Sequence, residues 1–104
     1  MCNIYTSTDP ILYESRTRSV RILGVVTTIR MENAFWDVLQ EMAESEKTTT
    51  NHLISNLYEE LVGCREGGGN FASFLRVCCL RYLAAKERGE TLSQPSMFLR
   101  IVKQ

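Results

Sequence analysis

The stretch GVVTTIRMENAFWDVL, from Gly24 to Leu39, changes its periodicity halfway along. Up to Met31 the side chains alternate as in a strand, whereas from Asn33 the apolar residues recur with the spacing of a helix. No helix precedes this stretch, and no second strand of similar quality is joined to it by a hairpin turn. A single strand leaves backbone N–H and C=O groups unpaired, which is costly when they are buried. The strand is therefore predicted to find a partner elsewhere.

The faces of this strand, predicted from Val25 to Met31, follow from the helix behind it, because side chains alternate with a period of two. The residues that share the core-facing side are Val25, Thr27, Ile29 and Met31. The residues that point outward are Val26, Thr28 and Arg30. The simplest partner for the unpaired edge is the same strand of a second copy, antiparallel across a two-fold axis, which makes an isologous dimer.

Apolar spacing predicts three helices, at residues 33–45, 50–62 and 71–88. Thr49 is the expected N-cap of the second helix, and Asn70 or Ser73 is that of the third. The third helix is nearly apolar all round, because Val77 and Leu80 extend its stripe of apolar residues. Such a helix is expected to be buried on several sides, more than two short helices can cover.

The chain has 104 residues, enough for one small domain. We expect an irregular N-terminal arm at 1–18, a folded domain at 19–88 and a C-terminal extension at 89–104. The predicted fold class is mainly α with one short strand. Domains of this size bury only part of their apolar surface, and oligomerisation often buries more of it.

The formal net charge is zero, but the charges are unevenly distributed. Residues 31–62 carry seven acidic side chains against Lys47 alone, whereas residues 63–104 carry seven basic against three acidic ones. This suggests a polarised surface, although a solvated mixture of charges is an equally open interpretation. No apolar run reaches 18 residues and no signal-peptide core is evident, so we expect a cytoplasmic protein without membrane contact.

The sequence offers no set of residues for catalysis or metal binding. The four cysteines form no C-x-x-C pair, and His52 has no cysteine at ligand spacing, so no metal is expected. Cys78 and Cys79 fall within an apolar helix, where free cysteine behaves as a small hydrophobe. The loop GCREGGGN lacks the lysine and preceding strand of a phosphate-binding loop. We therefore expect no enzyme activity, no cofactor and no small-molecule substrate.

A family resemblance runs through these elements. The segment TTIRMENAFWDVLQEMAESEKTTTNHLISNLYEEL, with the two residues before it and the one after it, resembles the ribbon-helix-helix fold of Arc- and MetJ-type repressors over residues 25–62. The segments RSVRILGVVTTIRMENAFW and GNFASFLRVCCLRYL together resemble a bacterial subfamily with an extra C-terminal helix. The resemblance implies a dimeric, sequence-specific DNA-binding transcription regulator that inserts a two-stranded ribbon into the major groove of double-stranded DNA.

The resemblance also implies roles for particular residues. The outward strand residues would contact base edges: Val26, Thr28 and Arg30. The residues just before the ribbon would add phosphate contacts: Arg16, Arg18 and Arg21. Carried over by position, a second phosphate clamp lies at the start of the second helix: Thr49, Thr50 and Asn51. Many relatives carry basic or polar residues where this chain has Val25 and Val26, so Val26 would offer only a methyl contact.

Less specific interpretations stand beside these roles. Arg30 on an exposed strand also suits a solubilising edge residue, and the triple threonine also suits a turn and cap. A second function class is a dimeric protein-interaction module, antitoxin-like or an adaptor, that uses the third helix and the C-terminal SMFLRIV. Salt dependence separates the two classes, because DNA binding releases counterions and apolar association does not.

Overall fold

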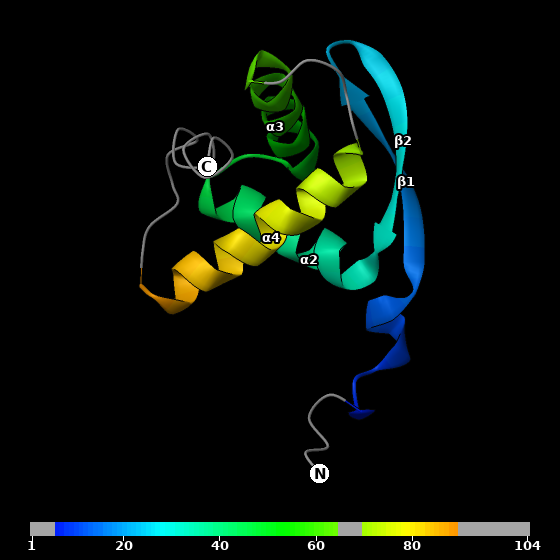
Figure 1. Cartoon of the computed structure of the whole chain (residues 1–104). Helices are drawn as coiled ribbons and strands as arrows, with labels where there is room; N and C mark the ends of the chain where they lie inside the picture. The colour runs from blue at the N-terminus through cyan, green and yellow to red at the C-terminus, as the bar shows by residue number, and fades with distance from the viewer. Residues whose placement is uncertain (1–5, 65–69, 90–104) are drawn as a thin grey trace.

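The computed structural model describes residues 6–64 and 70–89 of the chain. Its elements, in order, are η1 (Pro10–Tyr13), β1 (Ser15–Ile22), β2 (Val25–Glu32), α2 (Asn33–Ser45), α3 (Thr50–Cys64) and α4 (Phe71–Glu87). The two strands form a long hairpin along one side of the three helices (Figure 1). Within the described ranges, no helix is long and apolar enough to span a membrane. The expected extension after Gly89 and most of the glycine-rich loop lie outside the described residues.

The three predicted helices are confirmed, and so are two of their caps. Helix α2 has the predicted bounds, whereas α3 runs two residues further and α4 ends one residue earlier. The Thr49 hydroxyl accepts a hydrogen bond from the His52 N–H at 3.1 Å, and the Asn70 side chain accepts from the Ser73 N–H at 3.2 Å. Each cap pairs a backbone N–H that the first helical turn leaves without an intrahelical partner.

The prediction of a single strand is wrong, because β2 has a partner within its own chain. Strand β1 pairs antiparallel with β2, in a register that runs from Ser15 opposite Glu32 to Ile22 opposite Val25. The turn between them is Leu23–Gly24, whose φ angles of 51° and 82° are both positive, as a type I′ hairpin turn requires. Residues 15–18, expected to be irregular, are thus the first half of β1.

The predicted strand faces are confirmed where the helices cover the sheet. Ile29 and Met31 are buried, and β1 adds Val20 and Ile22 to the same core. Val25 is 64% exposed despite its core-facing parity, because it sits at the tip of the hairpin. The remaining core comes from one face of each helix, including Trp36, Leu39, Met42, Ile54, Leu57, Leu75, Cys78 and Cys79.

Helix α4 packs on α2 and is held there by polar contacts at both ends. Near its start, the Arg76 Nε lies 3.0 Å from the Glu32 carboxylate at the end of β2. Near its end, the Tyr82 hydroxyl donates to the Glu41 carboxylate at 2.9 Å, and Lys86 pairs with the same carboxylate. These contacts tie α4 to the end of β2 and to α2.

The expectation that α4 is buried on several sides is not met within one chain. Its inward face is buried, but three apolar side chains on other faces are exposed: Val77, Leu80 and Leu83. Leu80 is the most exposed of the three, at 57%. Helix α2 and strand β2 pack against the inward face of α4, and the three apolar side chains remain as an exposed stripe.

Candidate nucleic-acid interface

The face of the hairpin that points away from the helices is exposed along both strands. On β2 it presents the predicted base-contacting residues Val26, Thr28 and Arg30, all exposed. Directly opposite them on β1, in the same order, are Arg21, Ser19 and Thr17. Because paired residues of an antiparallel sheet point to the same side, the face carries two cations, three hydroxyl groups and one apolar side chain.

The two edges of the hairpin differ in how their backbone groups are used. The Asn33 N–H donates to the Glu14 C=O at 2.9 Å, one step beyond the last pair of the hairpin. Glu14 and Asn33 are therefore a hydrogen-bonded pair, and the bonded pairs of the hairpin can be counted from them. Bonded and non-bonded pairs alternate in an antiparallel ladder. By that alternation the backbone N–H and C=O groups of Val26, Thr28 and Arg30 point to the outer edge of β2. Among the described residues, no strand lies on that edge.

The outer edge of β1, in contrast, is bonded to α3 at Arg21. The Arg21 N–H donates to the Asn51 side-chain oxygen at 2.9 Å, and the Asn51 amide donates back to the Arg21 C=O at 3.0 Å. This two-bond bracket places the first turn of α3 beside β1. Asn51 is one of the residues predicted to contact a DNA phosphate, and its side-chain amide is engaged with the protein backbone.

The three arginines of β1 do not share one face. The Arg18 guanidinium lies 5.1 Å from the Trp36 ring centroid, on the helix side of the sheet. The Trp36 indole N–H donates to the Arg16 C=O at 2.9 Å, which anchors the ring beneath the strand. Of the three, Arg21 alone lies on the outward face with Arg30, and one of its N–H groups reaches the Gly24 C=O at 3.3 Å.

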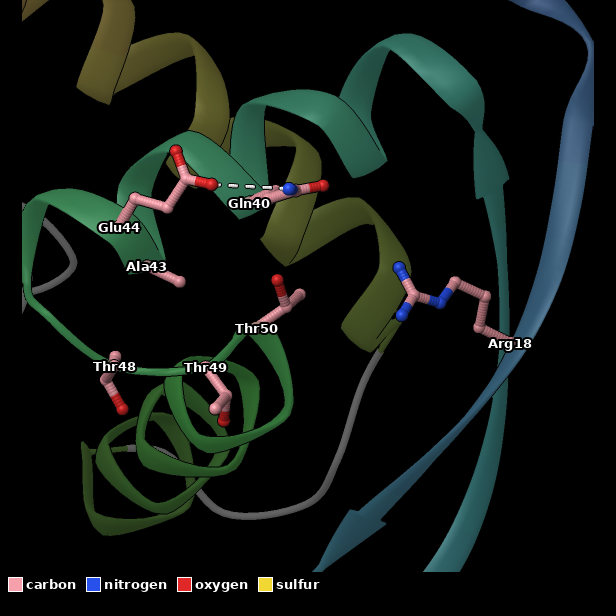
Figure 2. Close-up of a pocket in the computed structure, with 7 residues that line it drawn as sticks. All are labelled: Arg18, Gln40, Ala43, Glu44, Thr48, Thr49 and Thr50. Atoms are coloured by element: carbon pink, nitrogen blue, oxygen red, sulfur yellow. Dashed lines mark hydrogen bonds between the residues drawn. The ribbon is translucent and has the colours of Figure 1, made fainter.

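Three of the predicted phosphate-contacting residues meet in a polar hollow beside the start of α3. Arg18, Thr49 and Thr50 line it, together with Gln40, Ala43, Glu44 and Thr48. The hollow has a volume of about 340 Å³. Figure 2 shows Arg18 reaching from the strand toward Thr50. On α2, which also lines the hollow, the Gln40 amide donates to the Glu44 carboxylate at 3.3 Å. The hollow thus combines the Arg18 cation, the N-terminal end of a helix and the Glu44 carboxylate.

The carboxylate of Glu32, at the end of β2, is held by α4. A hydrogen bond from its own backbone amide, and then the contact with Arg76, lower the pKa of Glu32 below the ordinary value. Glu32 is therefore ionised at neutral pH and directed toward Arg76. This pairing neutralises a charge that would otherwise offset Arg30 at the end of the ribbon.

Sequence reasoning identified the outward residues of β2 but missed their counterparts on β1. The overlooked signal is the alternation in SRTRSVRI, where Val20 and Ile22 face the core and Arg21 points away. It also missed the role of Asn51, because a bond between a side chain and a strand thirty residues away leaves no local pattern.

Comparison with known proteins agrees with this architecture. A family profile described as a ribbon-helix-helix domain matches residues 15–83, from the first residue of β1 into α4. An uncharacterized protein from Bordetella pertussis Tohama I, whose structure is solved, is 42% identical to the chain, with a TM-score of 0.81. The match covers 89% of this chain and 74% of that one. None of the curated proteins matches. The extent of the profile match shows that the chain belongs to the ribbon-helix-helix family.

Proposed function

We propose that this protein is a dimeric, sequence-specific DNA-binding transcription regulator of a bacterial cytoplasm. The observation that carries the proposal is the exposed outward face of β2, with Val26, Thr28 and Arg30 in line beside an open strand edge. A two-stranded ribbon fits the major groove, where each base pair presents a distinct pattern of donors and acceptors.

The proposed dimer forms through the outer edge of β2. Among the described residues that edge has no partner strand, whereas on the corresponding edge of β1 Asn51 bonds the backbone of Arg21. An open edge favours pairing with another strand. A two-fold axis near Thr28, at the middle of β2, pairs the two copies over most of their length and keeps the arginines at position 30 apart.

In the proposed complex the central residues read the bases. Arg30 donates two hydrogen bonds to the O6 and N7 atoms of guanine, the commonest specific contact in the major groove. Thr28 bonds a base edge, and Val26 packs on a thymine methyl group. The bidentate contact of Arg30 supplies most of the discrimination between base pairs, because neither Thr28 nor Val26 can donate two parallel hydrogen bonds.

Phosphate contacts are proposed at the start of α3 and along β1. Thr49, Thr50 and the Arg18 guanidinium lie together at the N-terminal end of α3, where the helix dipole and the cation favour an anion. Arg16 and Arg21 add positive charge to the same strand. These contacts carry no sequence information but fix the position of the protein on the duplex.

A second candidate function is a dimeric protein-interaction module. It is supported by the exposed stripe of Val77, Leu80 and Leu83 on α4, since helices with an exposed apolar face serve as docking surfaces. In this alternative the hairpin supplies the dimer contact and α4 binds a protein partner.

The test compares Arg30→Ala with Thr27→Ala on a duplex selected from a random pool and on its scrambled version. Arg30→Ala should cost roughly 1–3 kcal/mol on the selected duplex and reduce the preference over the scrambled one. Thr27, half-buried on the other face, should affect stability more than preference. A wild-type protein that binds neither duplex at low salt would instead support the interaction module.

A further inference from the structure

We infer that the DNA-facing sheet is four strands wide and that β1 forms its phosphate-contacting rim. The inference rests on the proposed function and specifies which strand meets which part of the DNA. Its basis is the hairpin itself: β2 already has β1 on one edge, so pairing at the other edge gives the strand order β1–β2–β2–β1.

The width of such a sheet decides where β1 lies. Neighbouring strands are about 4.8 Å apart, so the two outer strands are separated by about 14 Å between their backbones alone. The major groove is about 12 Å wide and admits a two-stranded ribbon. The two β2 strands therefore occupy the groove, and each β1 lies over its border, where the phosphates run.

The outward side chains of β1 suit phosphate rather than bases. Thr17 and Ser19 each offer a hydroxyl donor, and Arg21 offers a guanidinium with further N–H groups beyond the one directed to Gly24. All three are exposed. Hydroxyl and guanidinium groups are common donors to phosphate oxygens.

The bracket between Asn51 and Arg21 ties this rim to the start of α3. The two hydrogen bonds, at 2.9 and 3.0 Å, hold the Arg21 backbone against the first turn of the helix. The outward hydroxyls of β1, Arg21 and the N–H groups of α3 therefore follow one another along the same border of the sheet. One phosphate strand passing that border meets donors from both elements.

A different arrangement places the hairpin of one chain in the groove by itself, with β1 and β2 both reading bases. The outward side chains of β1 then have a different role, because Arg21 faces base edges instead of phosphates. The two arrangements differ in a measurable way. A phosphate contact contributes to salt dependence on any sequence, whereas a base contact contributes to preference between sequences.

The experiment measures Arg21→Gln, Arg30→Gln and Arg81→Gln on the selected and scrambled duplexes across a series of KCl concentrations. Arg81 is exposed on α4, so its variant controls for the loss of one positive charge per chain. Arg21→Gln should weaken binding to both duplexes by the same factor and lower the salt slope by about two per dimer, one phosphate per chain. Arg30→Gln should reduce the preference, and Arg81→Gln should change neither quantity.

Two results would overturn the inference. A loss of preference in Arg21→Gln would show that β1 reads bases, and an unchanged salt slope would show that β1 does not meet phosphates. Failure of the proposed function would be seen in the wild-type protein and not in a variant. A wild-type protein that binds neither duplex at low salt would contradict both the DNA-binding function and the phosphate-contacting role of β1. Circular dichroism of each variant checks that the fold is retained.

Discussion

At the scale of single residues, Leu23 has the most strained backbone conformation of the hairpin. Its φ of 51° lies in the left-handed region, where the Cβ of an L-residue crowds the following carbonyl oxygen at a cost of roughly 1–2 kcal/mol. Gly24, the next residue, has no Cβ and adopts its φ of 82° freely. The turn thus combines one favourable residue with one that is strained.

Replacing Leu23 with Asn should therefore stabilise the protein. Asn tolerates the left-handed region, and the side chain removed is exposed, so we expect the free energy of unfolding to rise by roughly 1 kcal/mol. Leu23→Ala is the matched control, because it shortens the side chain and keeps the strain. Chemical denaturation measures both. A destabilised Leu23→Asn would mean that the leucine makes contacts outside the single chain.

The two buried cysteines should make the stability of the fold depend on pH in the alkaline range. Burial raises the pKa of both Cys78 and Cys79 from 9.0 to about 12. The folded state then holds protons that the unfolded state releases, so stability should fall as pH rises through 9 toward 12. Cys78→Ala/Cys79→Ala should show a flatter decline in denaturant unfolding across this window. An equal slope in both proteins would contradict the burial of the thiols.

At the scale of elements, the helices and β2 were predictable, and β1 was not. Regular apolar spacing and the caps Thr49 and Asn70 define the helices locally. Strand β1 shows apolar alternation only in its second half, at Val20 and Ile22, because Arg16 and Arg18 occupy the helix-facing positions of its first half. The turn concealed it further, since a type I′ turn usually shows Asn-Gly and here shows Leu-Gly.

The part of the candidate site that lies on β2 was predictable from the sequence, and the part that lies on β1 and α3 was not. Exposure of Val26, Thr28 and Arg30 follows from alternation along β2, which the sequence displays. The opposite faces of Arg18 and Arg21 follow from the same alternation once β1 is known to be a strand. The bracket of Asn51 depends on how α3 packs beside the hairpin, which no short-range pattern encodes.

The edge pairing of β2 predicts a pattern of amide hydrogen exchange. In a single hairpin only alternate β2 amides are bonded, those of Val25, Thr27, Ile29 and Met31. In the proposed dimer the amides of Val26, Thr28 and Arg30 should also exchange slowly, as NMR can measure residue by residue. Strand β1 supplies the control: Arg21, bonded to Asn51, should be protected, and Thr17 and Ser19 should exchange fast. Fast exchange at Thr28 would argue against the dimer.

At the scale of the whole molecule, we expect a dimer at micromolar concentration. Proline is tolerated on an edge strand when its missing N–H faces outward. Thr28→Pro should therefore keep the hairpin but remove a hydrogen bond between copies, and shift sedimentation toward the monomer. Ser19→Pro, at the equivalent position on β1, is the matched control and should remain dimeric. A wild-type chain that sediments as a folded monomer would refute the prediction.

The exposed edge of β2 has a consequence for how the proposed regulator would respond to its own abundance. In the proposed complex each chain supplies only half of the groove-filling ribbon, so the species that would occupy an operator is the pair. Below the dissociation constant of that pair, its concentration follows the square of the total chain concentration, so doubling synthesis gives about a four-fold rise in occupancy while sites are scarce. A regulator built this way responds to its own dosage with a threshold, and variation at a single exposed strand edge is enough to move that threshold.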